Sequence, residues 1–274
     1  MTVFQALVLG VVQGLTEYIP VSSSAHLVLL PWLLRWDIPQ QTAFVFDVLV
    51  QWGTLAAVVA YFWRDLWEIA AGMIAGLLRG KPFEGVPAQM GWLIIAATIP
   101  TGLAGLLLKG FFETMFGNPQ AVAALLFGTA ALLTFSERFS QQEGWLERIR
   151  LSDAVIIGCW QAVAILPGIS RSGATIAGGL SRGVKREAAA RFSFLISIPI
   201  LLAAGLLAMR DLLGMGGLRP LLPALAVGFV SAAVVGFAVV AWLLRYLRNH
   251  TLYVFAAYCA ALGLACLLVA AARG

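Results

Sequence analysis

The chain has 274 residues, of which 61% are hydrophobic and only 11% are charged, and its mean hydropathy is +0.92. A soluble domain is about half apolar and about 25% charged, so this composition excludes an ordinary soluble protein and predicts a polytopic helical membrane protein. The net charge is +5. The Lys and Arg residues lie between apolar runs, which is typical of membrane topology and not of nucleic-acid binding.

The first apolar run, from Val3 to about Ile19, shows no basic n-region and no cleavage site, so we expect no cleavable signal peptide. Pro20 and three serines then interrupt it. The next apolar piece, Ala25–Leu34, has ten residues, which rise about 15 Å as a helix, or half of a hydrocarbon core. We therefore predict a re-entrant hairpin with its tip at Pro20–Ser24.

The rest of the first half contains three predicted spans, at Thr42–Trp63, Gly91–Leu108 and Gln120–Phe135. Between the first two, the charged stretch Leu66–Ala88 predicts a cytoplasmic-type loop with a short amphipathic helix. Lys109–Pro119 is predicted as a short loop.

The pattern of the opening returns in the second half of the chain. Cys159–Leu180 is apolar, is broken at Pro167-Gly168 and then carries Ser170, Arg171 and Ser172. We interpret this as an internal duplication, with approximate repeats 1–136 and 150–274 in a single transmembrane domain. Three further spans follow, at Phe192–Met209, Pro220–Leu244 and Leu252–Ala271.

Each half therefore consists of one re-entrant helical hairpin and three transmembrane helices. An odd number of crossings inserts the second half upside down, so the predicted fold is all-α with two inverted repeats. Placing Arg64–Ala88 in the cytoplasm puts twelve basic residues on that side and five on the other, which obeys the positive-inside rule. Both termini are then predicted outside, and the two hairpin tips meet inside the membrane.

The polar side chains at the two tips form a candidate site. Glu17 is an acid, a base or a hard-metal ligand, and His26 is a base or a nucleophile. Ser22, Ser23 and Ser24 offer a nucleophile or anion donors, and Arg171 offers a fork suited to phosphate. The helix that opens after Pro167-Gly168 turns its first N–H groups toward the tip, as in anion sites.

Each of these residues also has a structural interpretation. Serines cap helices, a histidine on an apolar helix often bonds to backbone, and Glu17 with Arg171 can be a structural ion pair. The duplication favours a functional site because it brings all of them to one place. Asp47 and Gln51, one turn apart on the next span, are further candidates for the same cavity. Three cysteines in apolar runs, Cys159, Cys259 and Cys266, are predicted to pack in the core.

The motifs QGLTEYIPVSSSAH (Gln13–His26) and PGISRSGAT (Pro167–Thr175), with the intervening stretch Phe46–Leu66, resemble the undecaprenyl-diphosphate phosphatase family of the bacitracin-resistance type. The resemblance covers most of the chain. It implies an integral enzyme of the bacterial plasma membrane that hydrolyses undecaprenyl diphosphate to the monophosphate and phosphate. That reaction recycles the lipid carrier for peptidoglycan synthesis.

The resemblance also implies roles for single residues. Gln13 and Glu17 match the two acidic-type positions of the first motif, Ser23 matches the proposed nucleophile, and His26 matches the family histidine. Arg171 matches the phosphate-binding arginine. The family uses a divalent cation, Mg²⁺ or Ca²⁺; some members carry Glu where this chain has Gln13, so one charge is lost here. The other expected phosphate-binding residues are Ser22, Ser24, Gly168, Ser170, Ser172 and Gly173.

Several alternatives stay open from the sequence. The nucleophile is Ser23, His26 or water, and the base is His26 or Glu17. A transporter or flippase for a phosphate-headed lipid also fits inverted repeats with broken helices, and an anion-binding scaffold for cell-wall enzymes fits less well. The expected partners are a polyprenyl diphosphate substrate and membrane lipid but no nucleic acid, and a homodimer stays open.

Overall fold

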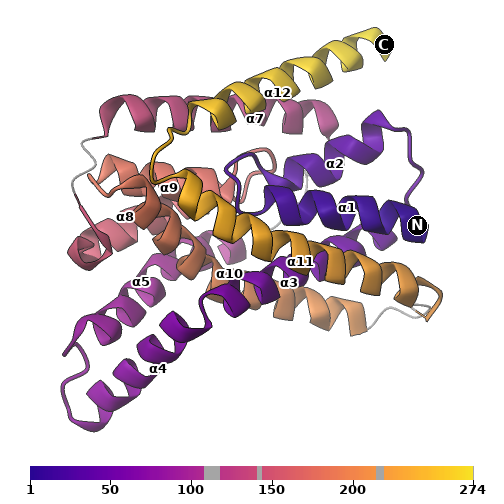
Figure 1. Ribbon diagram of the computed structural model, residues 1–274. Helices are drawn as coiled ribbons and strands as arrows, with labels where there is room; N and C mark the ends of the chain where they lie inside the picture. Colours follow the sequence, from indigo (N-terminus) through magenta and orange to yellow (C-terminus); the bar gives the residue numbers. More distant parts are fainter. Residues whose placement is uncertain (108–117, 141–143, 214–218, 274) are drawn as a thin grey trace.

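The computed structural model describes residues 1–107, 118–140, 144–213 and 219–273, and the regular elements in these ranges are helices (Figure 1). The all-α prediction is confirmed. Most of the predicted Lys109–Pro119 loop lies outside the described residues. Beyond the helices, the described part contains one isolated bridge between Gly144 and Val184.

Among the described residues, six helices are long and apolar enough to cross a membrane. The shortest has 21 residues, which rise about 30 Å and match the hydrocarbon core. They agree with the six predicted spans within a few residues at most ends. Their bounds are α3 Gln40–Tyr61, α5 Val86–Leu107, α7 Pro119–Phe139, α10 Arg186–Leu213, α11 Leu222–Tyr246 and α12 Tyr253–Arg273.

Four shorter helices form the two predicted hairpins. The first hairpin consists of α1 (Val3–Thr16) and α2 (Ser23–Leu33), and the second of α8 (Leu151–Val163) and α9 (Arg171–Ser181). None of these helices exceeds 14 residues, so none spans a bilayer alone. One hairpin and three long helices in each half are compatible with inverted repeats.

The prediction for Leu66–Ala88 was wrong in extent. The structure has a 16-residue helix, α4 (Trp63–Leu78), that starts directly after α3 with a bend at Phe62. α4 packs against α5 as an antiparallel pair that projects from the rest of the molecule (Figure 1). Glu68 lies on this amphipathic helix, whereas Arg79, Lys81 and Glu84 lie in the short connection from α4 to α5. The charges on both sides of the helix hide its length in the hydropathy pattern. Two short 3₁₀ turns, η1 (Leu146–Arg148) and η2 (Arg219–Leu221), complete the described elements.

Close packing of small residues holds the first hairpin against the second half. α11 lies along α1 and α3. A Cβ atom at Gly10 of α1 would lie 2.5 Å from the carbonyl oxygen of Gly228 in α11, so this approach requires glycine. Such contacts are typical of membrane helices, where small residues let backbones meet. α12 packs mainly on α7, and α9 lies among α7, α8 and α10.

The cysteines differ in part from the prediction. Cys259 and Cys266 are buried as expected, but Cys159 is exposed on α8. An apolar run does not reveal which face of a membrane helix meets lipid, and a small hydrophobic thiol is tolerated on either face.

Candidate active site

The tip of the first hairpin is a tight turn between α1 and α2. Glu17 follows the last turn of α1 and is buried, with its side chain 5% exposed. Ser22 is the N-cap of α2, and its Oγ accepts a hydrogen bond from the N–H of Ala25. Ser22 has a φ of 69°, a left-handed conformation that is strained for a residue with a side chain. This turn places Ser23 at the first position of α2.

The tip of the second hairpin has the corresponding construction. Ser170 is the N-cap of α9, and its Oγ accepts from the N–H of Gly173. Gly168 has a φ of 105°, and a Cβ there would lie 2.6 Å from the carbonyl oxygen of Val122, so the turn requires glycine. Thr129 of α7 fixes the turn by donating to the carbonyl of Gly168 and accepting from the N–H of Ser170. Arg171 is thereby placed at the first position of α9.

The two tips meet at the carboxylate of Glu17. The guanidinium of Arg171 donates to Oε1 at 2.7 Å, and the hydroxyl of Ser23 donates to Oε2 at 2.7 Å. Gln13 donates its Nε2 proton to the same Oε2, also at 2.7 Å. A second contact joins the tips directly, because Ser172 Oγ donates to the carbonyl of Ile19. The predicted meeting of the two hairpins is therefore present.

The remaining predicted serines form two matching pairs. The hydroxyls of Ser22 and Ser24 lie 3.2 Å apart, and those of Ser170 and Ser172 lie 3.2 Å apart. Each pair lies at the N-terminal end of its helix, where the first backbone N–H groups lack partners within the helix. The N–H of Gly173 is already bonded to Ser170, so the backbone donors left at this end of α9 are those of its first two residues.

In the described structure His26 makes no hydrogen bond to Ser23. Its Nδ1 lies 2.8 Å from the carbonyl oxygen of Ser22, and its Nε2 lies 2.7 Å from the hydroxyl of Tyr258 on α12. Of the two bases left open by the sequence, Glu17 is the one hydrogen-bonded to Ser23. The geometry thus separates a Glu17–Ser23–Arg171 centre from a neighbouring His26–Tyr258 pair.

Comparison with known proteins shows similarity to one family over nearly the whole chain. The family model described as bacitracin resistance protein BacA matches residues 6–265. A relative from Myxococcus xanthus, named undecaprenyl-diphosphatase, is 42% identical over 98% of this chain and 89% of its own length. Relatives of the same name from Thermomicrobium roseum and Chlorobium limicola are 43% and 42% identical, each with 98% of its own length covered.

The chain belongs to the bacitracin resistance protein BacA family.

Within this BacA-family site, Gln13 and Glu17 are suited to help hold a divalent cation. The Oε1 atom of Gln13 is buried and has no hydrogen-bond partner in the described structure, which leaves an oxygen free for a ligand. The described residues contain no group of three or more His, Cys, Asp and Glu side chains that could hold a metal alone. Mg²⁺ commonly binds one or two protein oxygens together with water and substrate phosphates, so this donor set fits a cation that arrives with the substrate.

One residue of the BacA-family site, Tyr18, was not predicted from the sequence. Tyr18 is fully buried, donates its hydroxyl to the carbonyl of Thr54 on α3, and lies under Arg171, whose guanidinium carbon is 5.8 Å from the ring centre. A tyrosine beside Glu17 in the motif was the available signal. The tip therefore contacts α3 through Thr54. The role expected for Asp47 and Gln51, which lie on the same helix, stays a prediction.

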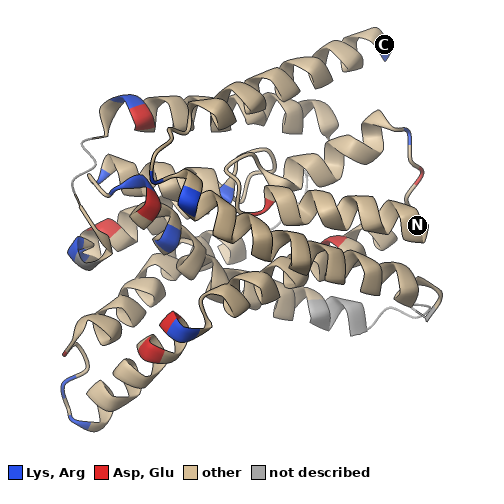
Figure 2. Ribbon diagram, viewed as in Figure 1, with Lys and Arg blue, Asp and Glu red and all other residues tan. Residues whose placement is uncertain are grey.

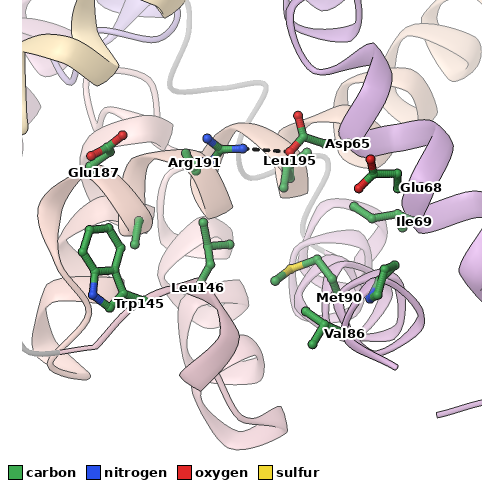
Figure 3. Close-up of a pocket in the computed structure, with 12 residues that line it drawn as sticks. Asp65, Glu68, Ile69, Val86, Met90, Trp145, Leu146, Glu187, Arg191 and Leu195 are labelled. Atoms are coloured by element: carbon green, nitrogen blue, oxygen red, sulfur yellow. Dashed lines mark hydrogen bonds and ion pairs between the residues drawn. The ribbon is translucent and has the colours of Figure 1, made fainter. Parts of the chain in front are cut away.

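A pocket of about 370 Å³ lies apart from the hairpin tips (Figure 3). An ion pair of 2.7 Å between Asp65 and Arg191 lies in its lining, with Glu68 and Trp145 nearby. None of the residues at the two tips lines this pocket.

A row of buried aromatic side chains runs from this pocket to the first tip of the BacA-family site. Arg191 lies over the ring of Phe62, which packs against Phe194, which in turn packs edge-on against Tyr18. The three aromatic side chains are fully buried. The pocket and the tip are thus joined by packed side chains.

Proposed function

We propose that this chain is an undecaprenyl-diphosphatase, which hydrolyses undecaprenyl diphosphate to undecaprenyl phosphate and inorganic phosphate. Membership of the family and the relatives named undecaprenyl-diphosphatase support this activity. The observation that carries it is the position of Glu17, which binds a hydroxyl from one hairpin and a guanidinium from the other. The product is the lipid carrier of peptidoglycan synthesis, and its recycling accounts for bacitracin resistance.

Arg171 is proposed to bind the diphosphate. Its NH2 group is engaged by Glu17, but its NH1 group is buried without a hydrogen-bond partner in the described structure. A buried N–H donor without a partner is costly, and phosphate oxygens would satisfy it. The open N–H groups at the starts of α2 and α9 add donors for the same anion.

Ser23 is proposed as the nucleophile and Glu17 as its base. Glu17 takes the proton of Ser23 as Oγ forms a bond to the terminal phosphorus. The bond from that phosphorus to the bridging oxygen breaks, and undecaprenyl phosphate leaves. Water then hydrolyses the phosphoserine and releases phosphate. Arg171 stabilises the charge on the transferred phosphoryl group throughout. Attack by His26 or directly by water remains the alternative to this assignment.

A divalent cation, Mg²⁺ or Ca²⁺, is proposed to bind at Gln13 and Glu17. When bound there, it would neutralise charge on the phosphates of the substrate. Gln13 supplies its free Oε1, and it positions Glu17 through its Nε2 hydrogen bond. Because glutamine carries no charge, Glu17 provides the single carboxylate at these two positions.

The site is proposed to open toward the outer side of the plasma membrane, with both termini outside. The two termini lie at the same end of the molecule (Figure 1). Most Lys and Arg residues gather at the opposite end, which supports a cytoplasmic position for that end (Figure 2). A homodimer remains a prediction.

Release of phosphate from undecaprenyl diphosphate by the purified protein in detergent tests the proposal. Detergent abolishes compartments, so a transporter of phosphate-headed lipids would release none. We expect release that depends on Mg²⁺ or Ca²⁺. Absence of release with every divalent cation tested would reject the enzyme and favour the transporter, for which the pocket beyond the aromatic side chains would be the second opening.

A further inference from the structure

The two ring nitrogens of His26 have different partners. Nδ1 lies 2.8 Å from the carbonyl oxygen of Ser22, which can only accept a hydrogen bond, so Nδ1 carries a proton. Nε2 lies 2.7 Å from the hydroxyl of Tyr258, and in the neutral ring it accepts the hydroxyl proton. The planes of the two rings are nearly parallel, at 2°, and their centres lie 5.7 Å apart. Both hydrogen bonds select one tautomer and one ring orientation.

Tyr258 comes from the last helix of the chain, far from the motifs that define the family. Its side chain is 46% exposed on α12, and its phenol faces α2. Another tyrosine on this helix, Tyr253, is 45% exposed and makes no described side-chain hydrogen bond. The contact with His26 is thus a property of the position of Tyr258 and not of tyrosines on α12 in general.

The second polar connection between α2 and α12 lies at the other end of α2. Arg273 donates to the carbonyl oxygens of Trp32 and Leu33, at 2.9 Å each. The Tyr258–His26 bond lies at the end of α2 that carries Ser23. α12 therefore holds α2 near both of its ends, and the end next to the reacting hydroxyl is held through the imidazole.

We propose that Tyr258 is a positioning residue for His26 in the diphosphatase reaction. Its hydroxyl donates to Nε2 and, together with the Ser22 carbonyl at Nδ1, fixes the orientation of the imidazole, with Nε2 turned toward α12. His26 is then held in one orientation at the end of α2 that carries Ser23, and Glu17 is left as the base for Ser23. This inference rests on the proposed diphosphatase activity for its catalytic consequence, but the state of the imidazole can be measured without it.

Histidine-selective ¹⁵N labelling tests the proposal directly, because the chain has only two histidines, His26 and His250. The variant His250→Gln assigns the signals. In the wild type we expect His26 to show a protonated Nδ1 and an unprotonated, hydrogen-bonded Nε2. In Tyr258→Phe we expect the Nε2 signal to shift to that of an unprotonated nitrogen without a hydrogen bond, while Nδ1 stays protonated against the carbonyl of Ser22. An unchanged His26 spectrum in Tyr258→Phe overturns the proposal.

Kinetics give the second readout. Loss of the hydrogen bond that orients His26, at the end of α2 that carries Ser23, predicts a fall in kcat of about tenfold in Tyr258→Phe, with KM changed less than about twofold. The matched control Tyr253→Phe keeps wild-type values. In a His26→Gln background, Tyr258→Phe should cause no further loss, because its effect acts through the imidazole. An equal loss in both backgrounds overturns the proposal, whereas absence of phosphate release in the wild type rejects the proposed function and leaves the spectral test intact.

Discussion

Ser23 and Arg171 occupy equivalent positions in the two hairpins and donate to the two oxygens of one carboxylate. Each is the first residue of its helix, directly after a serine N-cap. Each lies 2.7 Å from Glu17, Ser23 at Oε2 and Arg171 at Oε1. The two hairpins therefore use the same backbone arrangement, which is compatible with the predicted duplication, and they carry different chemistry on it: a hydroxyl in one and a fixed positive charge in the other.

Replacement of Ser23 by alanine tests the nucleophile. Ser23→Ala removes the hydroxyl bonded to Glu17, and we expect the rate of phosphate release to fall by at least about 10³. Folding should be retained, because the N-cap hydroxyl of α2 belongs to Ser22. Ser181→Ala, at the far end of α9, serves as the control and should keep wild-type activity. Activity of Ser23→Ala near that of the wild type would leave His26 or water as the attacking group.

Replacement of Arg171 by lysine tests the phosphate role. A lysine ammonium is a single point of charge, so in Arg171→Lys it would pair with Glu17 and leave no donor in place of NH1. We expect kcat/KM to fall by about 10² or more. Arg182→Lys is the matched control, because Arg182 lies at the other end of α9 and pairs with Asp153 of α8. Equal kinetics for the two variants would show that a positive charge alone suffices at position 171.

The broken helices could be predicted from sequence because their signals are local. A proline followed by serines interrupts an apolar run that is too short to resume as a span, and the same pattern occurs twice. The meeting of Glu17 with Arg171 could be expected from the predicted duplication, since inverted copies would place their tips at one depth. These inferences need periodicity and length but no knowledge of side-chain packing.

The partners of His26 could not be predicted from sequence. Ser22 and Tyr258 are reached only after the rotation of α2 about its axis is known, and Tyr258 lies 232 residues away along the chain. Packing between helices sets that rotation. The same reason explains the exposed Cys159, because an apolar helix gives no sign of which face meets lipid. The helix α4 was underestimated because its charged first turn resembles a loop.

Glu137 on α7 is a buried carboxylate with a structural role. It accepts hydrogen bonds from Arg186 of α10 and from the backbone N–H of Leu252, just before α12, and its side chain is 1% exposed. It thereby joins α7, α10 and the start of α12 at one point.

Glu137→Ala is expected to destabilise the protein without changing the chemistry. The variant leaves Arg186 without its carboxylate, and since that arginine is 22% exposed, we expect a loss near the lower end of the buried range, about 3 kcal/mol. Thermal unfolding in detergent measures this loss. Glu187→Ala, which removes a more exposed ion pair with Arg248, should shift Tm far less. A larger shift for Glu187→Ala than for Glu137→Ala would contradict the assignment, as would a fall in kcat per folded molecule of Glu137→Ala.

Gln13→Glu tests the cation site. Without a cation, the new carboxylate would face Glu17 in place of the present hydrogen bond, so the two charges would repel and lower Tm. With a cation, the added charge would strengthen binding. We therefore expect a larger rise of Tm on adding Mg²⁺ than in the wild type, and an about tenfold lower Mg²⁺ concentration for half-maximal phosphate release.

The control for this variant is Gln120→Glu, which adds the same charge at the exposed start of α7. It should leave the Mg²⁺ dependence of Tm and of activity unchanged, since the side chain at this position is exposed and its negative charge suits a helix N-terminus. If Gln13→Glu and Gln120→Glu respond to Mg²⁺ alike, the cation does not bind at Gln13. The buried Oε1 of Gln13 would then have another partner, and Glu17 would act through Ser23 and Arg171 alone.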